Sequence, residues 1–170
     1  RGLDDATIRR FRLGYAPPAH GSLAASLAAD GITQDQLVDS GLMKRRDDGH
    51  ATDYFRDRVM FPITDRQGAT IGFGGRTLGD AQPKYLNSPE STVFHKGSVL
   101  YGLASARQAA HRANRVLVVE GYMDVIALAQ AGLNEAVAPL GTAVGEDQIR
   151  LLWTLAAEPV LCLDGDRAGR

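Results

Sequence analysis

The sequence predicts an α/β protein in which a parallel β-sheet follows a mixed α+β amino-terminal part. From residue 115 onward, short apolar runs alternate with helical patterns, and short links separate them. This order is typical of parallel strands joined by right-handed crossovers. Before residue 115, helical patterns come first and a strand-rich stretch follows. We therefore expect an amino-terminal subdomain over residues 1–114 and a sheet subdomain over 115–170.

The composition is that of an ordinary globular domain. Of 170 residues, 44% are apolar and 23% are charged, which excludes a disordered or collagen-like chain. The single cysteine, Cys162, excludes an internal disulfide and is consistent with a reducing cytoplasm. No apolar run approaches the roughly 18 residues of a membrane span, so we expect no membrane partner.

Local patterns place the elements before residue 115. Helical stretches are expected at Leu3–Leu13, Ser22–Ala29 and Thr33–Gly41. Residues 44–49 are charged and are expected to form a solvated loop. Thr33 with Gln36 is a capping-box pattern, and Gly41 is a stop signal. Strands at Val59–Ile63 and Ala69–Phe73 are joined by a turn at 65–68, and Pro62 favours an edge or a bulge. Residues 74–102 show little periodicity, and a helix follows at 103–113.

The sheet subdomain has the clearest pattern. We expect strands at 115–119, 135–138 and 159–163. The expected helices between them are 122–131 and 144–157. Glu120 follows the first strand, and Asp164 and Asp166 follow the third. Because the carboxyl ends of parallel strands meet at one edge, these carboxylates are expected to lie together, with Asp124 nearby.

A cluster of that kind needs positive charge. Carboxylates two residues apart on an extended chain, at about 6.6 Å, repel by roughly 2.5 kcal/mol at an effective dielectric constant of about 20. Mg²⁺ would relieve this repulsion and take substrate phosphates as further ligands. The alternative is that Glu120 caps the following helix and that Asp164 and Asp166 form a simple turn.

Longer motifs resemble a known family. Val118–Val125 and Leu163–Gly169 resemble the glutamate and Asp-x-Asp motifs of the TOPRIM superfamily, whose sheet is Rossmann-like. Further stretches resemble the catalytic core of bacterial replicative DNA primases: Arg58–Ile63, Gly72–Arg76, Pro83–Glu90, Phe94–Gly97 and the opening Leu3–Pro17. The resemblance covers essentially the whole chain.

The resemblance implies roles for individual residues. Glu120 would position the metal and assist deprotonation of the attacking hydroxyl. Asp164 and Asp166 would be direct ligands of Mg²⁺ or Mn²⁺, with Asp124 in support. The nucleotide triphosphate or the template–primer backbone would be held by Arg76, Lys84 and Lys96, with Asn87 as a secondary polar contact.

The resemblance also implies template-directed synthesis of short RNA primers from ribonucleoside triphosphates on single-stranded DNA, in the bacterial cytoplasm. Residues 1–115 contain 16 Lys/Arg and 12 Asp/Glu, against 3 and 8 in 116–170, so the first part would attract the DNA backbone. We expect a monomeric fragment whose zinc-binding and helicase-binding modules lie elsewhere. The alternatives are another TOPRIM enzyme (a nuclease, or a topoisomerase with Tyr122 as nucleophile) and a non-catalytic module that binds nucleic acid through metal.

Overall fold

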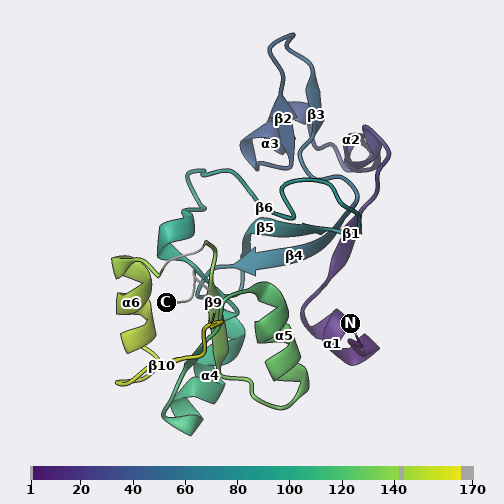
Figure 1. Cartoon of the computed structure of the whole chain (residues 1–170). Coiled ribbons are helices and arrows are strands. Elements are labelled where there is room, and N and C mark those ends of the chain that lie inside the picture. Colours follow the sequence, from purple (N-terminus) through teal and green to yellow (C-terminus); the bar gives the residue numbers. More distant parts are fainter. Residues whose placement is uncertain (1, 142–143, 166–170) are drawn as a thin grey trace. The chain divides into compact units, whose positions relative to one another are not determined.

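The computed structural model describes residues 2–141 and 144–165 (Figure 1). Helices and sheets are mixed as predicted, and by packing they form two compact units. The first unit contains the described residues of 1–12, 63–71 and 95–170, and the second contains 13–62 and 72–94. Because both units combine separate segments, the sequential division at residue 114 stays a prediction.

A four-stranded sheet organises the first unit, with strand order β10–β8–β9–β7. β8 (Leu117–Val118) pairs in parallel with β9 (Ala136–Pro139) on one side and with β10 (Val160–Leu161) on the other. The predicted parallel sheet is therefore confirmed. β7 (Leu100–Tyr101) adds an antiparallel strand beside β9, within a stretch that we expected to be irregular.

Helices of the first unit agree with the predicted pattern, although some are shorter. They are α1 (Asp5–Arg10), α4 (Leu103–Ala113), α5 (Tyr122–Gln130) and α6 (Glu146–Trp153). The 3-10 turn η1 (Lys96–Ser98) was not predicted. α4 has the predicted bounds. α6 is shorter than the predicted 144–157, because its last turn tightens into a bond from the Leu155 N–H to the Leu152 carbonyl. Among the described residues, no helix is long and apolar enough to cross a membrane.

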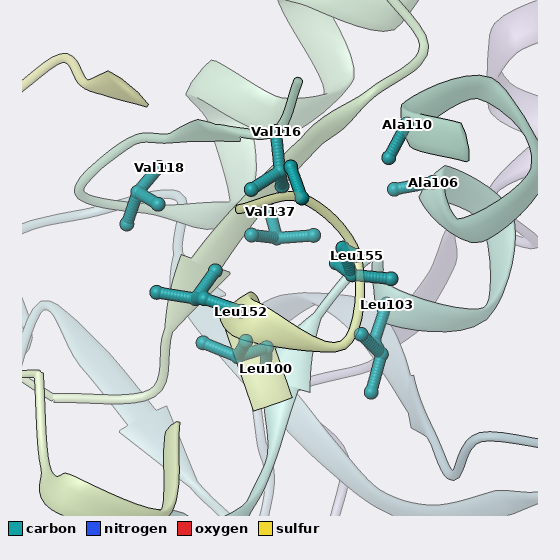
Figure 2. Close-up of a cluster of buried hydrophobic side chains, with 10 residues drawn as sticks. Leu100, Leu103, Ala106, Ala110, Val116, Val118, Val137, Leu152 and Leu155 are labelled. Carbon is teal, nitrogen blue, oxygen red and sulfur yellow. The ribbon is translucent and has the colours of Figure 1, made fainter. Parts of the chain in front are cut away.

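The core of this unit lies where α4 and α6 meet one face of the sheet (Figure 2). Its buried members come from β7 to the turn after α6, and they are Leu100, Leu103, Ala106, Ala110, Val116, Val118, Val137, Leu152, Leu155 and Ala156. By strand alternation, Leu117 and Val119 point to the opposite face. β8 and β9 are therefore covered by protein on both sides, which explains their continuous apolar sequence, whereas Val160 and Leu161 of the edge strand β10 are exposed.

An ion pair between a buried glutamate and a half-exposed arginine closes the amino end of the parallel strands. Arg115 precedes β8, Glu135 precedes β9, and the Arg115 Nε and a terminal nitrogen donate to Glu135 Oε1 at 2.9 and 2.7 Å. Burial raises the pKa of Glu135, but the hydrogen bonds and charge of Arg115 together with backbone hydrogen bonds outweigh it, so the net pKa is lowered. The pair therefore holds Glu135 in its charged form, at the sheet edge opposite to the strand-end carboxylates.

The second unit contains most of another four-stranded sheet, with strand order β1–β4–β5–β6. Its strands are β1 (Gly14–Ala16), β4 (Arg58–Thr64), β5 (Thr70–Thr77) and β6 (Tyr85–Asn87). β4 and β5 form the predicted hairpin, whose tip belongs to the first unit. β6 was not predicted, because three residues inside an irregular stretch carry no readable period.

Two predictions for the second unit need correction. β4 lies between β1 and β5 and is not an edge strand, although Pro62 lies beyond Met60, the last residue that β1 pairs. Part of the expected loop 44–49 is also structured. β2 (Met43–Arg45) and β3 (Ala51–Asp53) pair in an antiparallel hairpin, and the charged residues between them are exposed.

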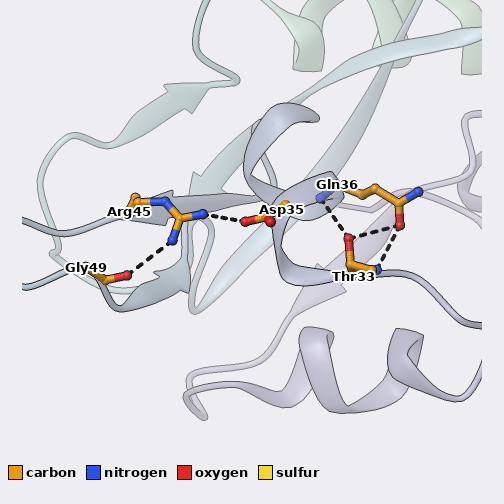
Figure 3. Close-up of polar contacts among 5 residues, drawn as sticks. All are labelled: Thr33, Asp35, Gln36, Arg45 and Gly49. Atoms are coloured by element: carbon orange, nitrogen blue, oxygen red, sulfur yellow. Dashed lines mark hydrogen bonds and ion pairs between the residues drawn. The ribbon is translucent and has the colours of Figure 1, made fainter.

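The helices of the second unit are α2 (Ser22–Ala28) and α3 (Gln34–Asp39). The predicted capping box begins α3: Thr33 Oγ1 accepts from the Gln36 N–H at 3.3 Å, and Gln36 Oε1 accepts from the Thr33 N–H at 2.8 Å (Figure 3). Arg45 of β2 donates to the Asp35 carboxylate of this helix and to the Gly49 carbonyl. The hairpin is thus attached to α3 by an exposed ion pair.

We predict that Gly102→Ala destabilises the first unit more than Gly132→Ala does. Both glycines have left-handed backbone angles, with φ of +81° and +92°. At Gly102 a Cβ would also lie 2.9 Å from Val125 Cγ1 and 3.1 Å from the Ala136 carbonyl oxygen, whereas at Gly132 nothing lies within 4 Å. Urea unfolding should show a loss of about 1–2 kcal/mol for Gly132→Ala and about 2–5 kcal/mol for Gly102→Ala. Equal losses would contradict the close approach at Gly102.

Candidate functional site

Two of the predicted acidic residues meet at the carboxyl edge of the first unit's sheet, through the side chain of one and the backbone of the other. Glu120 follows β8 and Asp164 follows β10, and the two strands are parallel neighbours. Glu120 Oε1 accepts a hydrogen bond of 2.8 Å from the backbone N–H of Asp164. Glu120 is half-buried and Asp164 is exposed, so the pair lies at the border between the sheet and solvent.

Of the two alternatives for Glu120, the structure favours the strand-end cluster over the helix cap. The residue that caps α5 is Asp124, whose Oδ2 accepts from the Gly121 N–H at 3.1 Å. Asp124 is exposed in the first turn of α5, where a negative charge is favourable. Its position is therefore explained by the helix, and a role at the metal stays a prediction.

The third predicted ligand, Asp166, lies outside the described residues. Within 2–141 and 144–165, no group of three or more His, Cys, Asp or Glu side chains is close enough together to hold a metal ion. The structure thus brings together Glu120 and Asp164 and leaves the full ligand set untested. Carboxylate oxygens of this kind are the ligands that Mg²⁺ and Mn²⁺ prefer.

Lys96 lies at the same edge of the sheet. β7 runs antiparallel to β9, with Leu100 opposite Pro139. The segment just before β7 therefore lies where β9 ends, and that segment is the turn η1, which begins at Lys96. The edge carries, in strand order, Asp164, Glu120, the end of β9 and Lys96. Strands are about 4.8 Å apart, so β7 lies about two strand spacings from β8, and Lys96 lies four residues before β7 begins at Leu100.

The other predicted cations belong to the second unit. Arg76 of β5 is paired with Tyr85 of β6, and its guanidinium carbon lies 5.8 Å from the centre of the Tyr85 ring. The Arg76 Nε is buried and has no hydrogen-bond partner among the described residues. Lys84 precedes β6, and its carbonyl accepts from the Thr77 N–H at 3.1 Å.

The remaining predicted contact, Asn87, is paired with Gly74 on the same two strands. Arg76, Lys84 and Asn87 therefore lie on one β5–β6 ladder, as part of a single local structure. Residues 74–102 show little periodicity, so the sequence does not predict this pairing.

Sequence reasoning missed Arg58, which supports this ladder. Its side chain is buried, with the residue only 5% exposed, and it donates to the carbonyls of Gly75 and Lys84 at 3.3 Å each and of Pro83 at 2.8 Å. Burial lowers the pKa of Arg58, and the nearby Asp57 opposes this effect. A charged residue at the start of a strand gives no local signal of such a role.

Tyr122 does not have the setting of a nucleophile. It is 5% exposed, and its ring packs edge-on against Tyr101, with centroids 4.7 Å apart at 70°. Burial and the neighbouring Tyr122 raise the pKa of Tyr101. Both rings are thus core aromatics, which argues against the topoisomerase alternative.

Two family models match the chain. The DNA primase catalytic core, N-terminal domain, matches residues 1–107, and the Toprim domain matches residues 114–170. The DNA primase of Escherichia coli (strain K12) is 51% identical over 170 residues, which are 100% of this chain and 29% of that primase. The chain thus spans less than a third of the length of this curated relative.

Solved structures agree with these matches. A crystal structure of a DNA primase domain from Pseudomonas aeruginosa superposes with a TM-score of 0.93 at 52% identity, covering 99% of this chain and 53% of that one. A structure of the DnaG primase catalytic domain bound to single-stranded DNA gives a TM-score of 0.88 at 50% identity, covering 99% and 54%. The Toprim match implies the use of divalent metal ions in general.

We predict that Arg58→Met destabilises the second unit strongly, whereas Arg45→Met does so weakly. Loss of Arg58 leaves three carbonyls in and beside the β5–β6 connection without this donor, which should lower the free energy of unfolding by about 2–4 kcal/mol. Arg45 also contacts a carbonyl and a carboxylate, but its side chain is 52% exposed, so its loss should lower that free energy by less than about 1 kcal/mol. Urea unfolding measures the loss of free energy of unfolding in both variants. Similar losses would show that Arg58 does not support the ladder.

Proposed function

Since the chain belongs to the DNA primase catalytic-core family, we propose that it is the part of a primase that joins ribonucleotides into short RNA primers on a DNA template. The observation that carries this proposal is the contact between Glu120 and the Asp164 backbone at the carboxyl edge of the sheet. Single-stranded DNA, the RNA primer and ribonucleoside triphosphates are the proposed partners. Zinc and helicase binding are assigned to parts of the longer protein outside residues 1–170.

The proposed metal is Mg²⁺ or Mn²⁺, held by Glu120, Asp164 and Asp166. The fit rests on the chemistry of the donors: the two described carboxylates are hard oxygen ligands on neighbouring strand ends. A carboxylate has about four lone-pair sites, so the bond from the Asp164 N–H leaves Glu120 able to bind a cation as well. A bound divalent ion supplies Lewis-acid stabilisation of charge on the phosphoryl oxygens.

Glu120 is the proposed base or base-orienting group. The bond from the Asp164 N–H fixes one carboxylate oxygen, so the side chain does not have to be ordered when substrate binds. In the proposed reaction, the 3′-hydroxyl oxygen of one nucleotide forms a bond to the α-phosphorus of the next. The bond from that phosphorus to the oxygen bridging to the β-phosphate breaks, pyrophosphate leaves, and the hydroxyl proton is lost to a base.

The cations have complementary proposed roles. Lys96, at the same edge as the carboxylates, would bind the phosphates of the incoming nucleotide. Arg76 and Lys84, with Asn87, would bind nucleic acid or nucleotide phosphates from the β5–β6 ladder. The excess of Lys and Arg over Asp and Glu in residues 1–115 supports a salt-dependent attraction for DNA.

Asp164→Asn in the full-length protein tests the proposal. Its backbone N–H still donates to Glu120, so only the charge of the side chain is lost. We expect primer synthesis to fall by about a hundredfold or more, because stabilisation of the transition-state charge is lost. Affinity for single-stranded DNA should stay within about twofold, because Asp164 is not a phosphate-binding cation.

The matched control is Asp147→Asn. Asp147 is an exposed aspartate on α6 of the same unit, and its Oδ1 lies 3.8 Å from a terminal nitrogen of Arg150. This variant should leave synthesis unchanged. Full synthesis by the Asp164 variant would remove this residue from the site. DNA nicking without nucleotide incorporation by the wild type would identify a TOPRIM nuclease, and metal-dependent DNA binding with neither activity would identify a non-catalytic module.

A further inference from the structure

One buried polar side chain joins α6 to the turn that carries Lys96. Gln148, in the first turn of α6, is only 2% exposed. Its Nε2 donates to the carbonyl of Lys96 at 3.0 Å and to that of Val99 at 2.9 Å. Its Oε1 accepts from the N–H of Gly145 at 2.9 Å. The bonds to Lys96 and Val99 span 52 and 49 residues of sequence, so they fix one segment of the unit against another.

The orientation of this amide follows from its surroundings. Two carbonyl oxygens need donors and one N–H needs an acceptor, so nitrogen must face η1 and oxygen must face the start of α6. Both N–H groups of Gln148 are used. An apolar residue would fill the same space but would leave these carbonyls without their buried donor, which is costly away from water.

The two carbonyls enclose the η1 turn. Lys96 begins η1 and Val99 follows it, directly before β7. Gly145 also packs beside this turn, since a Cβ there would lie 3.7 Å from the Gly97 carbonyl oxygen. Gln148 therefore holds both ends of the segment that brings Lys96 to the carboxyl edge, where Glu120 and Asp164 meet.

We propose that Gln148 is a positioning residue, which fixes the Lys96 backbone so that the Lys96 ammonium group meets the phosphates of the incoming nucleotide. The inference rests on the proposed function. A lysine side chain has four rotatable bonds, so its usefulness at a phosphate depends on a fixed starting point. Shifts of about 1 Å in such groups cost up to about a hundredfold in rate.

The test uses the full-length protein and compares Gln148→Met with Lys96→Met. Methionine has a similar length but no N–H donor, so it removes the bonds to both carbonyls. We expect each variant to raise KM for ribonucleoside triphosphates about tenfold with a smaller change in kcat. The double variant should resemble Lys96→Met alone, because Gln148 acts through Lys96. Gln148→His, which keeps one donor and one acceptor, should be intermediate.

A second readout does not depend on activity. Amide hydrogen exchange in the peptide covering 95–99 should be faster in Gln148→Met than in the wild type, because the turn is released. The matched control is Glu135→Gln, which weakens another buried polar contact of this unit at the opposite edge of the sheet. It should change neither KM nor exchange at 95–99.

The outcomes separate the inference from the function on which it rests. If the wild type makes primers and Lys96→Met raises KM, but Gln148→Met does not, the inference is overturned. It is also overturned if the effects of Gln148→Met and Lys96→Met multiply in the double variant, since Gln148 would then act independently of Lys96. If the wild type makes no primers at all, the proposed function itself fails.

Discussion

The hydrogen bond from the Asp164 N–H to the Glu120 carboxylate is the contact on which the site depends. It exists because β8 and β10 are adjacent and parallel, so both chains leave the sheet at one edge. Apolar side chains pack on both faces of β8 and β9, and the Arg115–Glu135 pair joins the amino ends of these two strands.

Buried polar side chains fix the backbone next to the candidate cations. Gln148 binds the carbonyls around η1, and Arg58 binds those around the β5–β6 connection. The regular structure next to Lys96 and Lys84 is short, since η1 and β6 have three residues each. In both cases a side chain that is distant in sequence fixes the backbone of the segment. Gln148 does so within the first unit, and Arg58 does so within the second.

Sequence reasoning succeeded where the signal was local. The continuous apolar runs that end in Glu120 and Asp164, and the Thr33–Gln36 capping box, can be read from neighbouring residues. β6 and the β2–β3 hairpin were missed because strands of three residues are too short to show a period. β7 was missed because its two residues depend on a distant partner, as Leu100 does on Pro139. Arg58 and Gln148 were missed for the same reason, since their acceptors are distant in sequence.

Divalent-ion binding tests most directly whether the Glu120–Asp164 edge is a metal site. Titration of the full-length protein with Mn²⁺, followed by the electron paramagnetic resonance signal of free Mn²⁺, should reveal a site that Mg²⁺ competes for. Glu120→Gln and Asp164→Asn should each weaken Mn²⁺ binding at this site by about tenfold or more, because each removes a carboxylate charge. Mn²⁺ affinity that is unchanged in both variants would contradict the central claim.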